Sequence, residues 1–143
     1  MKCEYFVWTD RTRLPAVGDL TATLSQGGVT CEARPIRTDS HNNWTTLELR
    51  AETPDGEATC TITVTMPTPE EIDEMRQTYE TLPLQVKKAA RRYAVTAESD
   101  PYGQATDFHL RVTAAVARLT NGIIDDPKEN GLMMLDEFEE YIG

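Results

Sequence analysis

The fold of this chain is decided by residues 58–66, which have the sequence ATCTITVTM. Every second residue from Ala58 to Met66 is apolar, and all the residues between them are threonine. A period of two places alternate side chains on opposite faces of a β-strand. The pattern therefore predicts a strand with one buried apolar face and one polar face formed by threonine.

Runs typical of β-strands precede this stretch at 3–8, 20–24, 29–34 and 47–51. Two glycine-containing turns separate consecutive runs, at 26–28 and 54–56, and each suits a tight connection between antiparallel strands. Pro35 has no backbone N–H to donate, so its strand is expected to end there or to lie at an edge. Residues 1–66 are therefore predicted to be mainly β, as an antiparallel meander of four or five strands.

Residues 67–143 are predicted to be mainly helical, with two or three short strands. Thr68, followed by Pro69 and two glutamates, is typical of a helix N-terminus because its hydroxyl can accept from the first free N–H groups. A short basic helix is expected over 84–92 and a longer helix over 104–120. The longer helix carries apolar side chains at helical spacing: Phe108, Val112, Ala115, Val116 and Leu119.

Short strands are predicted on both sides of the longer helix, at 93–98 and 123–124. Asn121-Gly122 provides a stop signal for the helix. The second strand is expected to return parallel to the first, as in a βαβ unit with a right-handed crossover. A further strand at 132–135 and an acidic helix, capped by Asp136 and ending at Ile142, complete the prediction.

These elements predict an α+β fold in a single domain spanning residues 1–143, with the N-terminal meander packed on the C-terminal helices. Hydrophobic residues make up 39% of the chain and charged residues 27%, as is usual for a globular domain. No apolar run approaches the roughly 20 residues that cross a bilayer. The N-terminal residues do not resemble a signal peptide. We therefore expect a cytoplasmic protein that does not contact membranes.

Three cysteines, Cys3, Cys31 and Cys60, lie far apart and each falls in a predicted strand. Reduced, half-buried thiols are the expected state, and one disulfide is the alternative. A zinc site needs closer spacing and histidine partners. The sequence predicts no metal site and no cofactor.

Acidic residues outnumber basic ones by 24 to 14, giving a net charge of −10. Such a surface repels the phosphates of nucleic acids, so a nucleic-acid partner is not expected. The last 19 residues carry a net charge of −6, more than half of the excess. The final helix is therefore the candidate partner-binding surface, and a solvated helix without a function is the alternative. Its carboxylates are Asp136, Glu137, Glu139 and Glu140.

Asp125 and Asp126 follow a predicted strand, where carboxylates often serve metals or proton transfer. The next residue is Pro127, so ordinary turn chemistry is the competing interpretation. His109 lies on the longer helix outside its apolar stripe, and a flanking or surface position is expected. An alternative ligand pocket would need Asp125, Asp126 and His109 to line one concave site.

The segment 117–127, with the sequence ARLTNGIIDDP, ends a predicted helix and leads through an apolar pair into Asp-Asp-Pro. With its flanks, over about residues 90–135, it resembles small bacterial cytoplasmic α+β proteins of uncharacterised or toxin-immunity type. The resemblance implies an immunity protein that binds and neutralises a partner toxin. It implies no catalytic residue.

Two classes of function remain open from the sequence. The first is a non-catalytic module that binds another protein, such as a basic toxin, through an acidic surface. The second is a small enzyme or ligand-binding domain with a pocket near Asp125 and Asp126. The sequence contains no nucleophile motif and no glycine-rich phosphate loop, so the first class is favoured. A structural subunit is a third outcome, and the oligomeric state is left open.

Overall fold

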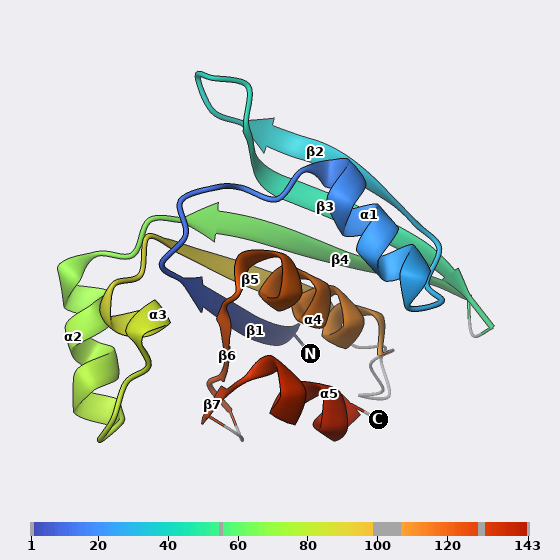
Figure 1. Cartoon of the computed structure of the whole chain (residues 1–143). Helices are drawn as coiled ribbons and strands as arrows, with labels where there is room; N and C mark the ends of the chain where they lie inside the picture. The colour runs from blue at the N-terminus through green and yellow to red at the C-terminus, as the bar shows by residue number, and fades with distance from the viewer. Residues whose placement is uncertain (1, 55, 99–106, 129–130, 143) are drawn as a thin grey trace.

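The computed structural model describes residues 2–54, 56–98, 107–128 and 131–142. In this part of the chain, seven strands form one sheet in the order β2-β3-β4-β5-β1-β6-β7, with five helices (Figure 1). All neighbouring strands are antiparallel. The α+β class is confirmed. The strands are β1 (Lys2–Thr9), β2 (Cys31–Thr38), β3 (Trp44–Thr53), β4 (Gly56–Thr65), β5 (Arg91–Glu98), β6 (Ile123–Asp126) and β7 (Gly131–Met133).

The helices lie on both faces of the sheet, and two hydrophobic clusters result. The larger cluster lies under α1, α4 and α5, and the smaller one lies under α2 and α3 (Figure 1). Val7 belongs to the first cluster and its neighbour Trp8 to the second, because successive strand residues point to opposite faces. The helices are α1 (Val17–Gln26), α2 (Pro69–Thr78), α3 (Leu84–Lys87), α4 (Phe108–Thr120) and α5 (Leu135–Ile142).

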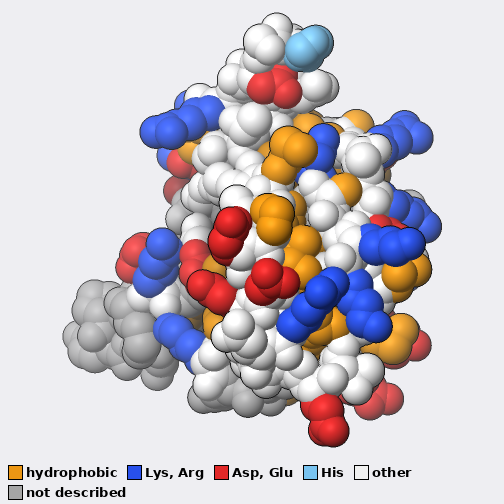
Figure 2. All heavy atoms as spheres, turned by 90° about the vertical axis from the view of Figure 1, so that its left-hand side faces the viewer, with side chains coloured by type: hydrophobic (Ala, Val, Ile, Leu, Met, Phe, Trp, Pro, Cys, Tyr) orange, Lys and Arg blue, Asp and Glu red, His pale blue; other side chains and the backbone are white. Residues whose placement is uncertain are grey.

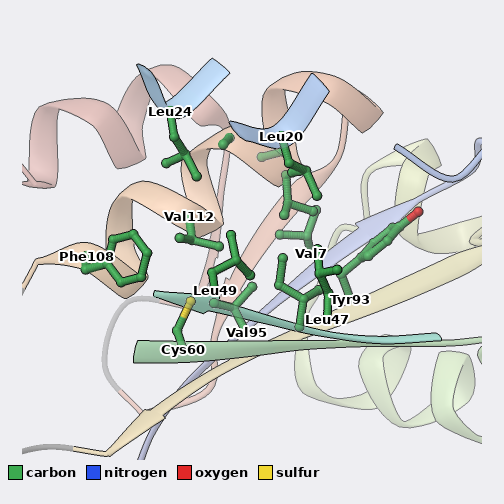
Figure 3. Packing of buried hydrophobic residues seen from close by; sticks show 14 of the residues in the cluster. Val7, Leu20, Leu24, Leu47, Leu49, Cys60, Tyr93, Val95, Phe108 and Val112 are labelled. Carbon is green, nitrogen blue, oxygen red and sulfur yellow. The ribbon is translucent and has the colours of Figure 1, made fainter. Parts of the chain in front are cut away.

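The alternating stretch that opened the sequence analysis forms β4, and its buried face is confirmed for Ala58, Cys60 and Ile62. Figure 3 shows Cys60 among the core side chains that lie between the sheet and the helices. Val64 is partly buried against the same cluster. The prediction was wrong for Met66, which is 71% exposed, because β4 ends at Thr65.

The predicted strand at 20–24 is wrong, because these residues belong to α1. Leu20 and Leu24 are both buried in the main cluster. Residues four apart share a face in a helix and also in a strand, so the pair fits either period. Gly27 and Gly28 end the helix, with Gly28 at φ +87°, and do not form a hairpin. The consecutive meander is therefore β2–β3–β4, and β5 extends it.

The two strands of the predicted βαβ unit run in the same direction, as expected, but they are not neighbours in the sheet. Strands β5 and β6 are each antiparallel to β1, so they run in the same direction, and α4 connects them. However, β1 lies between them in the sheet. Its central position suits its sequence, because Val7 and Trp8 bury side chains on opposite faces.

Several helix signals are confirmed. Thr68 and Glu71 form a capping box, in which each side chain accepts from the other's backbone N–H at 3.2 Å. The predicted basic helix over 84–92 is shorter, because α3 ends at Lys87 and the chain enters β5 at Arg91. The longer helix begins at Phe108, and residue 104, its predicted start, lies outside the described residues.

The end of α4 is set by its two predicted stop residues. Asn121 adopts a left-handed conformation at φ 53°. A Cβ atom on Gly122 would lie 2.5 Å from the Val7 side chain, so glycine is required where the chain crosses β1.

At the other end of the sheet, Pro35 lies on the edge strand β2 beside a register shift, as expected. In the ranges described, no helix combines the length and apolarity needed to span a membrane.

Candidate functional site

Helix α5 combines an apolar anchor with an acidic outer surface. Phe138 is fully buried in the main cluster and meets the Tyr5 ring edge-on at 5.6 Å between centroids. Asp136, Glu137 and Glu140 are exposed. The anchor fixes the orientation of the helix, so the three carboxylates occupy defined positions on the surface. We name these three residues the acidic surface of α5.

The fourth predicted residue, Glu139, is engaged by α4. Its carboxylate forms an ion pair with the Arg118 guanidinium, and both side chains are about half exposed. The partners are 21 positions apart in the chain, so helical spacing within α5 gave no signal for the pair. Glu139 therefore lies at the border of the acidic surface of α5, where its charge is compensated.

The start of α5 differs from the prediction. The helix begins at Leu135, and Asp136 lies in its first turn, so Asp136 is not the cap. Glu137 accepts from the Met134 backbone N–H at 3.3 Å. Carboxylates in the first turn are stabilised by the partial positive charge of the free N–H groups. This stabilisation offsets part of the repulsion between the clustered carboxylates.

Asp125 and Asp126 end the strand that directly precedes the predicted turn, and neither lies at the surface. Both belong to β6, with exposures of 6% and 5%. As neighbours in a strand they point to opposite faces of the sheet. Asp125 lies on the face covered by α2, and Asp126 lies on the face covered by α5. The turn begins one residue later, where the Lys128 N–H donates to Asp126 at 3.1 Å.

Burial raises the pKa of the Asp125 carboxyl, and the charge of Asp126 adds to the rise. The Trp8 N–H, the Tyr79 hydroxyl and Arg92 oppose it. Within the described ranges, neither Trp8 Nε1 nor Asp125 Oδ1 forms a hydrogen bond with good geometry.

Arg92 ties this side of the sheet to α2. Its guanidinium pairs with Glu71 at 2.6 Å and lies over the rings of Phe6 and Trp8, 4.9 and 5.3 Å from their centroids. The predicted helix over 84–92 did not anticipate this arrangement, because Arg92 belongs to β5. The sequence gives no local signal for it, because Glu71 lies 21 positions from Arg92 and Phe6 and Trp8 lie more than 80 positions away.

We expect Asp125→Asn to change the pH dependence of stability. Folding raises the pKa of this carboxyl above its value in the unfolded chain, about 3.9. The native state is therefore increasingly destabilised as the pH rises from the unfolded-state pKa to the folded-state pKa. The wild type should therefore lose stability over that interval relative to the variant. Urea unfolding at pH 4 and pH 7 measures the difference. The assignment would be contradicted if the variant, relative to the wild type, were destabilised more at pH 7 than at pH 4.

His109 is 4% exposed, so the expected surface position is wrong. Helix α4 is covered by the sheet on one side and flanked by α1 and α5, which widens its buried arc beyond the predicted stripe (Figure 1). The His109 ring lies 5.9 Å from the Tyr5 ring, centroid to centroid. Burial, followed by the charge of Asp126, raises the pKa of Tyr5.

Asp125, Asp126 and His109 therefore do not meet in one concave site. Asp126 and His109 both lie near Tyr5, and Asp125 is on the other face. Across the described parts of the chain, no group of three metal-ligating side chains is close enough to hold a metal ion. The three cysteines are free thiols, and burial raises the pKa of Cys60 to about 12.

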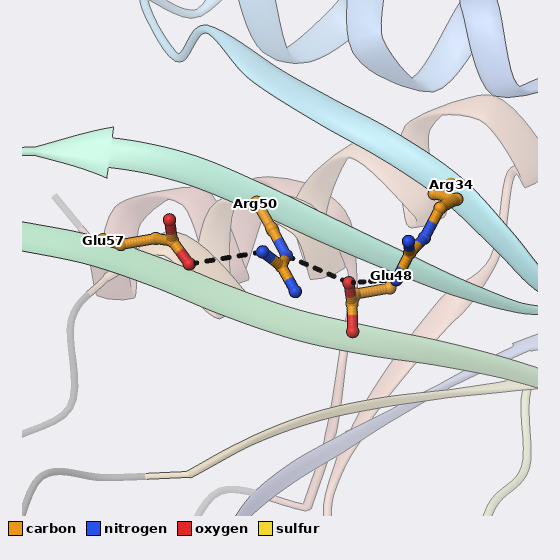
Figure 4. A network of polar contacts seen from close by, with 4 residues as sticks. All are labelled: Arg34, Glu48, Arg50 and Glu57. Atoms are coloured by element: carbon orange, nitrogen blue, oxygen red, sulfur yellow. Dashed lines mark hydrogen bonds and ion pairs between the residues drawn. The ribbon is translucent and has the colours of Figure 1, made fainter.

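The charges on the exposed face of the sheet are balanced. On the exposed face of β2, β3 and β4, Arg34, Glu48, Arg50 and Glu57 form a chain of ion pairs at 3.2, 3.0 and 3.7 Å (Figure 4). Its two cations and two anions cancel. On the face in Figure 2, acidic and basic side chains are interspersed with hydrophobic ones.

Comparison of the chain with protein-family models, with curated proteins and with solved structures found no match. The resemblance of segment 117–127 to toxin-immunity proteins therefore stays a prediction. In the fold, this segment is the end of α4, its left-handed stop at Asn121 and the buried strand β6.

Proposed function

We propose that the protein acts by binding another protein, and that the acidic surface of α5 is the contact. The observation that supports this most is the exposure of Asp136, Glu137 and Glu140 on a helix anchored by Phe138. A helix held by a buried side chain loses little backbone freedom on binding, so an anchored acidic helix is a better contact than a flexible tail.

The chemistry of this surface indicates a basic partner. The ion-pair chain on β2–β4 has no net charge, whereas the three exposed carboxylates of α5 have no opposing charge within their set. An excess of one sign steers an oppositely charged protein during diffusion and raises the association rate. A basic toxin, such as a nuclease whose active site binds phosphates, has the required charge. The protein would then serve as its inhibitor or immunity protein, without catalysing a reaction.

Affinity capture from the native host tests this proposal. The bait is the full chain, and the test variant combines Asp136→Asn, Glu137→Gln and Glu140→Gln. These substitutions remove three charges and retain an acceptor at position 137 for the Met134 N–H. We expect a basic protein that the wild type retains, and at least a tenfold loss of its affinity for the variant.

The matched control removes three exposed charges from α2 by Glu70→Gln, Asp73→Asn and Glu74→Gln. It changes the net charge equally at a helix on the opposite face of the sheet, so the partner should bind it as it binds the wild type. Thermal unfolding of all three proteins shows whether each is folded. A partner that binds the α5 variant and the wild type equally would contradict the proposed surface.

A further inference from the structure

A groove of about 440 Å³ lies on the outer side of α4. In Figure 1, α4 lies between α1 and α5, which form the two walls. The floor consists of Arg111, Ala114, Ala115 and Arg118. Their spacing of three, four and seven residues places all four on one face of the helix. The small alanines keep the centre of the groove open, with a guanidinium at each end.

The groove combines polar donors with an apolar surface. The C-terminal end of α1 contributes Thr23 and Gln26, whose side chains can donate hydrogen bonds. Leu24 from α1 and Ile142 from α5 supply apolar contacts. An occupant that suits this lining has an anionic group for one of the arginines and an apolar body above the alanines.

Both arginines are held by carboxylates that an anion can replace. Arg111 Nε lies 3.0 Å from Asp107, one helical turn earlier, and Arg118 pairs with Glu139 at the groove wall. All four side chains are at least 41% exposed. Exposed ion pairs of this kind contribute little stability, so exchanging one carboxylate for another is inexpensive. The guanidinium geometry also favours bidentate contacts with carboxylate, sulfonate or phosphate groups.

We propose that this groove is a binding site for a small amphipathic anion, whose charged group contacts Arg118 in place of Glu139 and whose apolar body covers Ala115 and Ala114 in the direction of Arg111. The site is separate from the acidic surface of α5 and does not depend on the protein-binding proposal. The chain has a net charge of −10, so a general attraction for anions does not explain binding here. The Arg118 guanidinium must provide the selectivity.

Titration of the ¹⁵N-labelled full chain with octanoate, followed by amide chemical shifts, tests the site. Saturable shifts are expected at the groove residues Thr23, Gly27, Ala114, Ala115 and Ile142. Arg118→Gln should weaken binding by about tenfold, the effect of losing one charge-assisted contact. Arg111→Gln, at the far end of the groove, should have a smaller effect. Glu139→Gln should strengthen binding several-fold, because it removes the competing carboxylate from Arg118.

Two controls separate this site from general adsorption. Arg76→Gln removes an exposed charge from α2 and should bind octanoate as the wild type does. The neutral alcohol 1-octanol has the same chain length and should bind far more weakly. The proposal is overturned if octanoate gives no saturable shifts at the groove, if 1-octanol binds equally well, or if Arg118→Gln has the same affinity as the wild type.

Discussion

Ile62→Asp is expected to leave the protein largely unfolded at 25 °C. Ile62 is fully buried at the centre of β4, between Leu47 on β3 and Val95 on β5. A carboxylate at this position has no cation to pair with in the apolar cluster, so the cost is several kcal/mol. That is comparable with the total stability of a typical domain, about 5–15 kcal/mol.

Circular dichroism during heating and urea unfolding measure this effect. Thr61→Asp is the matched control, because Thr61 lies on the opposite, partly exposed face of the same strand. The control should stay folded with a much smaller loss. Equal melting temperatures for Ile62→Asp and the wild type would show that β4 does not bury this face.

The second large effect is expected for Phe108→Ala, at about 3–5 kcal/mol. Phe108 is 2% exposed, at the first turn of α4, and packs into the main cluster (Figure 3). Its removal loses the burial of a ring and leaves a cavity that the rigid sheet below cannot fill. Urea unfolding gives the change in free energy. Leu84→Ala is the control, because Leu84 is 55% exposed, and it should change the free energy of unfolding by less than about 0.5 kcal/mol. Similar losses of stability for both variants would refute the packing of α4.

Local sequence patterns correctly predicted those strands and helices that are determined by a single short motif. The alternation at 58–66 identified β4, and the Thr68-Pro69 signal identified the start of α2. The pattern at 20–24 failed because two leucines four residues apart fit both periods, and the packing of α1 against α4 decided between them. The position of β1 between β5 and β6 depends on pairings with residues about 80 to 120 positions away, which a local pattern does not encode.

The candidate sites divide in the same way. The exposure of Asp136, Glu137 and Glu140 follows from their spacing around Phe138 within one helix. The burial of Asp125 does not, because it depends on α2 covering a second face of the sheet. From the sequence alone, Asp126-Pro127 is interpreted as part of a turn. In the structure, β6 extends through both aspartates and the turn follows at Pro127. The pairing of Glu139 with Arg118 is likewise a contact between helices.

The central claim is that the acidic surface of α5 steers a basic partner, and the association rate measured by stopped-flow mixing tests it most directly. Once the partner has been captured, its association is compared at low and at physiological salt, using the wild type and the α5 variant. We predict that the wild-type rate falls by about tenfold or more as salt screens the charges, whereas the variant starts slow and changes little. Equal rates for the two proteins at low salt would contradict the claim.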